Sequence, residues 1–387
     1  MVSLPRRVLA VYFFLTGTLF ALWGATLAAT DARLGLGPGR LGTVLLAMSL
    51  AAIATVPLAG RAAARWGSCR TVRTAAPAAA VAMAGPALAW DHLSLLAAAV
   101  VLGAMSGAMN VVLGLRAVET ERATGRPLMG RMQGLWTLGS VAGAGAVTIA
   151  FHLGAGARAV LVAGGLLLAA LYIAVAGPGG GRASAVAPPP VTAGTGRGVR
   201  LVVLGVIGAS AFVVEGAAAD WAGVHAATVL GASPAAASLA YTVFCVAMTG
   251  VRFAGDALRA RLGAARTVRA AGATAIGGLT LVLASPALGT PAALIGWAVA
   301  GAGVAMVWPV VASAAGDEGG LPRVSAIGYG GGLAGPALIG GLAEAATLPV
   351  ALLLPAALAV LIALAAPPVL RPGRSGLPGV EAAHAAV

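Results

Sequence analysis

The sequence predicts an all-α integral membrane protein with twelve transmembrane helices in two pseudo-symmetric six-helix halves. Hydrophobic residues make up 60% of the chain and charged residues 9%, far below the roughly 25% charged residues of soluble domains. Apolar runs long enough to cross a bilayer, about 17 to 25 residues each, recur along its whole length. The two halves of the chain also share short sequence patterns.

Twelve apolar runs are separated by short breaks that contain Arg, Gly or Pro. Each run is longer than the alternating segments of about ten residues in a membrane β-barrel, so each predicts a helix. The first run resembles a signal peptide, but its length and the lack of a clean cleavage site favour an uncleaved span. The predicted spans are 8–30, 41–60, 72–90, 93–115, 132–151, 157–176, 201–224, 234–254, 267–285, 290–312, 322–343 and 347–367.

The net charge of +13 is carried by arginine alone, and its distribution predicts the orientation of the chain. If the N-terminus is cytoplasmic and the number of spans is even, 21 arginines fall inside and only Arg33, Arg40 and Arg158 fall outside. This is the excess of positive charge expected of cytoplasmic loops. We therefore predict a multi-pass plasma-membrane protein with both termini cytoplasmic, and no nucleic-acid partner.

The composition also divides the chain into domains. Residues 177–200 are rich in Gly, Pro and Ala and predict a cytoplasmic linker between an N-terminal half, 1–176, and a C-terminal half, 201–367. Residues 368–387 have a similar composition and predict a disordered cytoplasmic tail.

The halves show weak internal similarity. "AGRAAARWGSCRTV" at 59–72, after the second span, parallels "AGDALRARLGAARTV" at 254–268, after the eighth. Spans 1 and 7 share a second pattern, which starts at Phe20 and at Phe212. Six-helix halves repeated in parallel are a known transporter architecture, with the substrate site near the bilayer midplane between them.

The loops after spans 2 and 8 resemble those of the major facilitator superfamily, whose pattern there is G-x-x-x-D-R-x-G-R-R. The first copy departs from the pattern, because Ala64 occupies the usual aspartate position. The resemblance implies that these loops form a conformational latch. Its residues here are Gly60, Arg65, Gly67, Gly255 and Asp256.

Longer stretches resemble a bacterial branch of that superfamily near the fucose permease, among them 117–144, 215–221 and 328–344. The resemblance implies secondary transport of a small polar, sugar-like solute across the bacterial inner membrane, coupled to protons, with spans 1, 4, 7 and 10 lining the cavity. The sequence departs from the branch at several polar positions, and Asn110 replaces the expected acid of the N-terminal half. The other departures are Gly114, Gln133 and Met306.

Glu215 is the first candidate for a functional group. It lies just beyond the centre of the seventh span, where an ionisable side chain costs at least a few kcal/mol and tends to face a cavity or a partner. Arg116 and Arg252 fall near inner helix ends, so we expect no cation at its depth. We predict that Glu215 exchanges the coupling proton; the alternative is a protonated or hydrogen-bonded structural glutamate.

Further side chains are candidates for the substrate cavity. Asn110 suits a hydroxylated ligand, although such residues also bridge helices. Asp220 lies about 7.5 Å beyond Glu215 and some 140° around the helix, so the two do not form a dyad. It serves as a gate or is simply solvated beside Trp221 at the membrane interface. Three tryptophans have flat faces that could bind a ring in the solute: Trp23, Trp297 and Trp308. The alternative is that these side chains pack against lipid.

Proline and glycine also form two informative patterns inside the predicted spans. Pro309 is predicted to break the tenth helix locally, and such breaks often border a binding cavity. Gly330, Gly332 and Gly335 match G-x-G-x-x-G but lie inside a span, so a dinucleotide site is not predicted. Small-xxx-small spacing predicts close helix packing instead, and it occurs at Gly103 and Gly107, Gly139 and Gly143, and Gly331 and Gly335.

The sequence predicts neither an enzyme nor a metal or cofactor site. The four histidines fall at span ends, in a loop or in the tail, and no phosphate-binding loop is present. The partners expected are a small-molecule substrate, protons and the lipid bilayer, with the chain acting as a monomer. Two alternatives stay open: an exporter of an amphiphilic metabolite or drug, and a membrane sensor that binds a ligand without moving it.

Overall fold

The computed structural model describes residues 6–124, 128–176, 198–316 and 320–370. Most of the predicted linker and tail lies outside these residues, but 198–200 and 368–370 are helical and belong to the neighbouring spans. The helices of the N-terminal half are α1 (Arg6–Leu34), α2 (Gly37–Trp66), α3 (Ser68–Ala82), α4 (Ala84–Leu88), α5 (His92–Thr124), α6 (Met129–His152) and α7 (Ala157–Ala176).

The C-terminal half repeats this arrangement with eight helices. They are α8 (Gly198–Thr228), α9 (Pro234–Leu262), α10 (Ala264–Leu288), α11 (Thr290–Val304), α12 (Val307–Gly316), α13 (Leu321–Ala345), α14 (Leu348–Ala351) and α15 (Leu353–Leu370). Within the described ranges, eleven helices or joined helix pairs are long and apolar enough to cross a bilayer. The remaining predicted span, 72–90, is divided into α3 and α4, each too short to qualify alone.

Each divided span breaks just before a proline. α3 ends ahead of Pro86, α11 ahead of Pro309, and α14 ahead of Pro355. Proline has no backbone N–H, so the carbonyl four residues earlier loses its helical partner. The predicted break at Pro309 is confirmed. A proline alone does not force a break, because Pro57 and Pro336 lie inside continuous helices.

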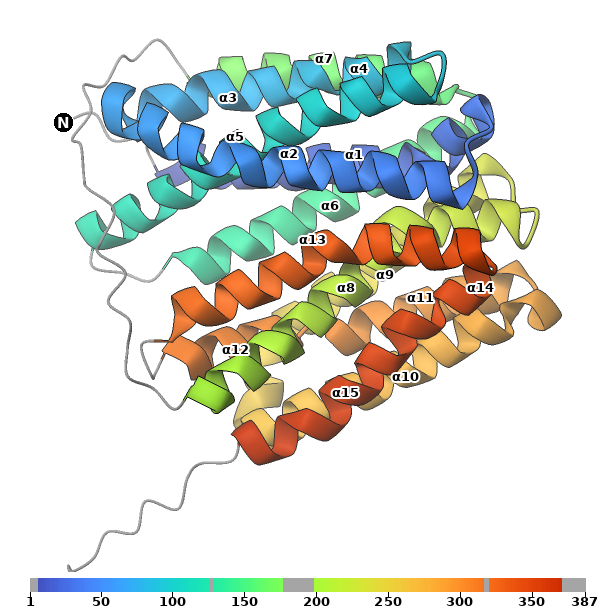
Figure 1. Ribbon diagram of the computed structural model, residues 1–387. Helices are drawn as coiled ribbons and strands as arrows, with labels where there is room; N and C mark the ends of the chain where they lie inside the picture. The colour runs from blue at the N-terminus through green and yellow to red at the C-terminus, as the bar shows by residue number, and fades with distance from the viewer. Residues whose placement is uncertain (1–5, 125–127, 177–197, 317–319, 371–387) are drawn as a thin grey trace, which may run out of the picture.

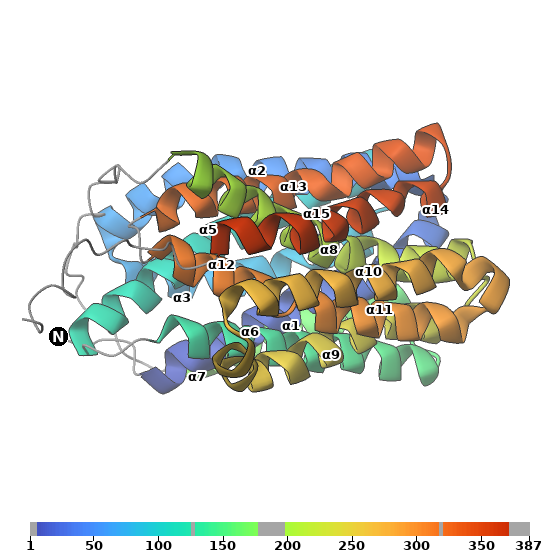
Figure 2. The ribbon, with the colours of Figure 1, turned by 90° about the horizontal axis from the view of Figure 1, so that it is seen from below.

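The two halves lie side by side as bundles of roughly parallel helices (Figures 1 and 2). The start of α1 and the end of α15 lie at the same end of the molecule, as an even number of crossings requires (Figure 1). We call this the terminal end and the opposite one the far end. The halves meet where α6 packs against α9, α2 against α13, and α1 against α8 and α9.

The internal repeat recurs in the backbone geometry. Gly67 has φ 87° between α2 and α3, and Gly263 has φ 74° between α9 and α10. Four residues later, the Thr71 hydroxyl donates to the Gly67 carbonyl (2.9 Å) and the Thr267 hydroxyl donates to the Gly263 carbonyl (2.8 Å). Positive φ favours glycine, which explains why both copies carry it. The two loops therefore adopt one conformation despite their different sequences.

Glycines allow close contact between helices within each half. A Cβ on Gly143 of α6 would collide with the backbone of Thr18 on α1, and a Cβ on Gly331 of α13 would collide with Ala209 on α8. Gly335, one turn along α13, lies against Val213. The prediction that these glycines serve helix packing is confirmed.

The far end is sealed where α2 meets α13. The Gly39 N–H donates to the Glu344 carboxylate (3.1 Å). One turn further, Gly42 lies against Gly340 so closely that a Cβ on Gly42 would collide with the Gly340 backbone. Neither half can therefore move outward here without breaking this contact.

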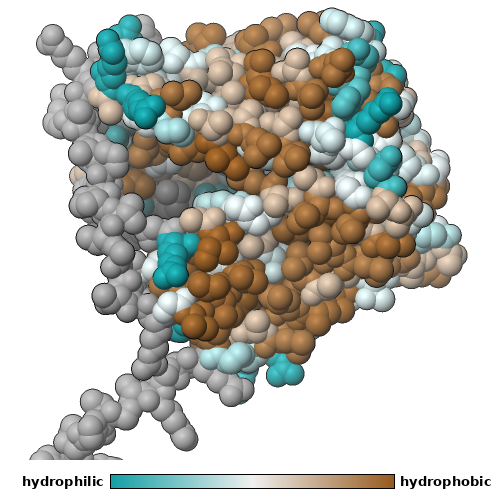
Figure 3. Space-filling view, in the orientation of Figure 1, coloured by the Kyte–Doolittle hydropathy of each residue, from teal (hydrophilic) through white to brown (hydrophobic). Residues whose placement is uncertain are grey.

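The terminal end is more open. Among the described residues, the hydrogen bonds of Thr148 of α6 with Thr242 and Ser238 of α9 join the halves at the far end. Toward the terminal end, one hydrogen bond joins them, from Arg252 to Thr137. Figure 3 shows a hollow in the surface between the two halves on that side, framed by an otherwise largely apolar face. The bundle is thus closed at the far end and hollowed toward the terminal end.

Candidate functional site

Glu215 faces a cation between the two halves. Its Oε2 lies 3.7 Å from Arg252 Nη2, and the side chains are 34% and 22% exposed. The prediction that no arginine lies at the depth of Glu215 is therefore wrong. The separation exceeds the roughly 2.7 to 2.9 Å of a charge-assisted hydrogen bond, so the ion pair is loose.

Two features of the backbone place Arg252 beside Glu215. α9 continues ten residues beyond Arg252, to Leu262, so Arg252 lies about 15 Å inside the helix rather than at its end. Its Nε donates to the Ala305 carbonyl (3.3 Å). In a continuous helix that carbonyl would accept from residue 309, but Pro309 has no N–H to give. The proline break therefore frees the acceptor that supports the guanidinium.

Arg252 also connects the two halves. Its Nη1 donates to the hydroxyl of Thr137, which lies on α6 of the opposite half. Glu215 and Arg252 lie on helices that face the other half, near the middle of the bundle, and both side chains are partly exposed. Because Arg252 reaches Thr137 of the opposite half, the partly exposed pair lies at the boundary between the halves.

An aromatic cluster lies next to this ion pair. Phe212 of α8 contacts Trp308 of α12 and Tyr329 of α13 at ring-centre distances of 4.8 and 5.0 Å, and Trp308 lies 5.4 Å from Tyr329. Tyr329 is 50% exposed, and Phe212 lies one helical turn from Glu215 on α8. Gly208 and Gly328 border the Trp308 ring and leave room for it. The cluster therefore offers ring faces beside the charged pair.

The other candidates for the cavity are placed differently. Asn110 is partly exposed on α5, and no described residue bonds to its buried Oδ1 atom. Trp297 is fully buried in the C-terminal half, and Trp23 is 3% exposed on α1. Neither ring lines the hollow, and neither faces lipid. Of the three tryptophans proposed as ligand faces, Trp308 is the one that belongs to the aromatic cluster.

Asp220 does not join the ion pair. It is partly buried on α8, and within the described chain no hydrogen bond or ion pair connects it to another residue. Trp221, expected to anchor in the membrane interface, is fully buried, so that interpretation is wrong. α8 packs against α1 at this level, where Ala219 meets Gly24, and this contact encloses the segment.

The latch residues lie at the terminal ends of the helices. Gly67 takes the positive φ of the loop, Arg65 is exposed, and Gly60 has open space beside it. Gly255 lies against the sulfur of Met306, whereas the side chain of Asp256 lies outside the described residues. Their role as a latch stays a prediction.

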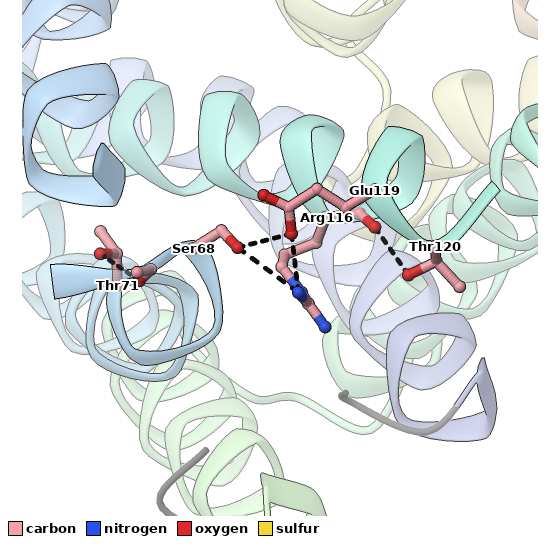
Figure 4. A network of polar contacts seen from close by, with 6 residues as sticks. Ser68, Thr71, Arg116, Glu119 and Thr120 are labelled. Carbon is pink, nitrogen blue, oxygen red and sulfur yellow. Dashed lines mark hydrogen bonds and ion pairs between the residues drawn. The ribbon is translucent and has the colours of Figure 1, made fainter. Parts of the chain in front are cut away.

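A polar network beside the first of these loops was not predicted (Figure 4). The Ser68 hydroxyl at the start of α3 donates to Glu119 Oε2 of α5 (2.7 Å), and Arg116 Nη1 donates to the same oxygen (2.7 Å). Ala64 occupies the position where related loops carry aspartate, and Glu119 supplies a carboxylate at this end of the half instead. The spacing of Arg116 and Glu119, three residues apart on one helix, is the signal that could have revealed the pair.

Two repeated helical halves around a hollow define the class of secondary membrane transporters. The chain is 32% identical over 359 residues to an uncharacterized MFS-type transporter of Yersinia pestis, covering 88% of this chain and 89% of that protein. It is 31% identical over 379 residues to an uncharacterized transporter of Sinorhizobium fredii, covering 94% and 97% of the two chains. The chain therefore belongs to the major facilitator superfamily, and it is a transporter, not an enzyme.

Solved structures share the fold at low sequence identity. A mutant of the nucleoside transporter NupG superposes with a TM-score of 0.74 at 14% identity, covering 94% of this chain and all of the other. The xylose transporter XylE from E. coli, in a partially occluded inward-open conformation, gives a TM-score of 0.69 at 13% identity, covering 92% and 96%. No protein-family model matches the chain. These likenesses establish the major facilitator fold and leave the substrate open.

Proposed function

We propose that this chain is a proton-linked transporter of a small polar, sugar-like solute in a bacterial inner membrane, with both termini cytoplasmic. The observation that carries the proposal is the loose ion pair of Glu215 and Arg252 between the halves. In an alternating-access carrier, the two halves rock around a central site that is reached by water from each side in turn. A carboxylate at that site can exchange a proton with both sides.

Protonation of Glu215 would change what holds the halves together. The charge of Glu215 attracts Arg252, while Arg252 also donates to Thr137 of the opposite half. When Glu215 takes up a proton, this attraction is lost, and the contact between the halves changes with it. A ligand or proton can shift a conformational equilibrium only through such a difference between states.

The orientation of the chain gives the hollow a direction. The 21 arginines predicted on one side of the membrane support a cytoplasmic position of the terminal end. The hollow, which lies toward that end of the molecule (Figure 3), is then on the cytoplasmic side of the bundle. Resemblance to the fucose permease branch, and two structural neighbours described as nucleoside and xylose transporters, make sugars and nucleosides the first solutes to test.

The test begins with a thermal-shift screen of sugars and nucleosides, because a ligand that binds the folded state alone raises its stability. The best ligand is then labelled and followed in proteoliposomes. Glu215→Gln is expected to abolish accumulation driven by a pH gradient while retaining exchange of labelled for unlabelled solute.

Asp91→Asn is the matched control for removal of a carboxylate. Asp91 is exposed, lies outside the spans and accepts from the Ser94 N–H at the start of α5 (2.8 Å), a cap that asparagine also makes. Hydrogen bonds from Ser94 hold the pKa of the Asp91 carboxyl below its usual value. It is therefore charged at neutral pH, as a control must be. An unchanged pH dependence in Glu215→Gln rejects the proton-coupling role.

A second candidate is export of an amphiphilic metabolite or drug. The rings of Phe212, Trp308 and Tyr329 favour it, and so does the apolar Met306, one of the positions where the chain departs from the branch that it resembles. Cells with and without the gene would then differ in their resistance to amphiphilic antibiotics. Equal resistance together with solute uptake in proteoliposomes would exclude export as the main activity.

A further inference from the structure

The guanidinium of Arg252 is only partly satisfied by its present partners. Nε donates to the Ala305 carbonyl and Nη1 donates to Thr137, but Nη2 makes only the loose contact with Glu215. An arginine has five N–H donors in a fixed planar fork. Since 22% of the side chain is exposed, the Nη2 edge can donate to a further partner.

The balance of charge decides what that partner is. In the present state the carboxylate of Glu215 offsets the charge of Arg252. Once Glu215 carries the coupling proton, Arg252 is left as an unbalanced cation among apolar and aromatic side chains, where a single charge is costly. A neutral sugar does not restore the balance. A carboxylate does, and it matches the fork of the guanidinium in two parallel hydrogen bonds.

The surroundings of the pair indicate the rest of the solute. Phe212, Trp308 and Tyr329 present ring faces beside Glu215, and Tyr329 is half exposed. A ring bound there would lie against the aromatic cluster while an acidic group on the ring reaches Arg252. A sugar acid and an aromatic acid share this chemistry.

We infer that Arg252 binds the carboxylate of a small, ring-bearing, singly charged acid, which enters the hollow when Glu215 is protonated. The inference rests on the proposed function for the protonation of Glu215. One proton and one anion then occupy the site together, so its net charge is the same with and without solute. Arg252 becomes the residue that selects acids over neutral solutes.

Among the described residues, few other titratable groups lie near Glu215. They are Asp220 on α8 itself, Tyr241 and Cys245 on α9, and Tyr329 on α13. The charged and titratable residues of α1 lie toward its ends, and α11, α12 and α15 carry none. Glu215→Gln therefore imitates the protonated state with little other change in charge.

The test is a thermal-shift titration of the purified full chain with two matched pairs of probes. Benzoate is compared with benzamide, and D-glucuronate with D-glucose, so that each acid has a neutral counterpart of similar shape. In Glu215→Gln, at least one of the acids is expected to raise the melting temperature at concentrations at least tenfold lower than its neutral counterpart. The acid that responds tells whether the body of the solute is a sugar or an aromatic ring.

The double variant Glu215→Gln with Arg252→Gln should lose the preference for acids, and it leaves no buried charge unpaired. Arg158→Gln in the Glu215→Gln background removes an exposed cation at the far end and should keep that preference. If Glu215→Gln does not distinguish acids from neutral counterparts, or if the double variant still does, the inference is overturned.

Failure of this inference differs from failure of the proposed function. The titration is an equilibrium measurement in detergent and needs no pH gradient. Binding of acids through Arg252 without pH-driven accumulation would remove the proton-linked function and keep the anion site. Proton-driven transport of a neutral solute, without the preference for acids, would remove the anion site and keep the proton-linked function.

Discussion

Two pairs of opposite charge lie on the described spanning helices of this transporter. Glu215 faces Arg252 across two helices of the C-terminal half, and Glu119 accepts from Arg116 on one helix of the N-terminal half. Removing one partner from such a pair leaves the other charge without compensation in an apolar region. The first pair is loose and partly exposed, whereas the second is short and also held by Ser68. The first pair can therefore break during transport, whereas the second stabilises the folded N-terminal half.

Glu119→Ala is expected to destabilise the N-terminal half, because it leaves the guanidinium of Arg116, 11% exposed, without its carboxylate. The loss should be about 2 to 3 kcal/mol, less than the roughly 3 to 5 kcal/mol of a fully buried pair, since Glu119 is partly exposed. Thermal and denaturant unfolding in detergent measures it. Ser68→Ala keeps the ion pair and should cost only about 1 kcal/mol. Equal losses in the two variants would contradict the role given to Glu119.

At this scale the sequence identifies unusual residues better than their partners. Glu215 could be found because a carboxylate in an apolar span is rare. Arg252 was placed too near a helix end, because apolar content marks the membrane boundary and not the end of α9. Trp23 and Trp297 were proposed as ligand faces although both are buried. In a membrane protein the core and the lipid are both apolar, so the pattern does not show which side of a helix faces inward.

Among the helices, the divided tenth span has the clearest effect on the site. α11 ends at Val304 and α12 begins at Val307, and the Ala305 carbonyl between them accepts from Arg252. The sequence predicted this break from Pro309. It did not predict the breaks ahead of Pro86 and Pro355, because other prolines in this chain sit in unbroken helices. Whether a proline divides a helix depends on partners for the freed carbonyl, which come from other parts of the fold.

Pro309→Ala is expected to supply the missing N–H, so that the Ala305 carbonyl is drawn into a continuous helix and away from Arg252. The folded state should become more stable by about 1 kcal/mol or more, a part of the ~3 kcal/mol that proline costs inside a helix. Binding of benzoate or D-glucuronate to the variant combined with Glu215→Gln should weaken several-fold. Thermal-shift titration measures both effects.

Pro57→Ala is the control for this prediction, because Pro57 is exposed inside the continuous α2. It should leave the binding of acids unchanged. Unaltered binding in Pro309→Ala as well would mean that Arg252 does not depend on the break.

The whole molecule is held closed at one end by small residues. Gly42 and Gly340 bring α2 and α13 together at the far end, and hydroxyl pairs join α6 to α9 there. Composition, charge and repetition predicted the fold class and the two halves. They did not predict the conformational state, because glycine and alanine look alike whether they face lipid, the hollow or the other half. Only the spatial contacts between halves distinguish these positions.

Gly42→Leu is expected to prevent closure of the far end, since even a Cβ at this position collides with Gly340. The population should shift toward the state open at the far end. Electron–electron distances between spin labels at Arg40→Cys and Thr347→Cys, both exposed there, measure the shift in a background without Cys69 and Cys245. The distance distribution should move to longer values.

Gly277→Leu serves as the control, because Gly277 is exposed and a Cβ there meets open space. Its distance distribution should match that of the unsubstituted chain. Identical distributions for Gly42→Leu and Gly277→Leu would show that the contact of Gly42 with Gly340 does not hold the far end shut.

The support that Arg252 receives from Ala305 comes from a main-chain oxygen, which every amino acid carries. Exchanges of the side chain at 305 during descent therefore leave this anchor intact, whereas a change at 309 abolishes it. Homologous carriers that retain arginine at 252 should thus keep proline at 309, because any other residue there offers an N–H to this carbonyl. In this way, the missing N–H of the proline would determine which solutes these transporters bind.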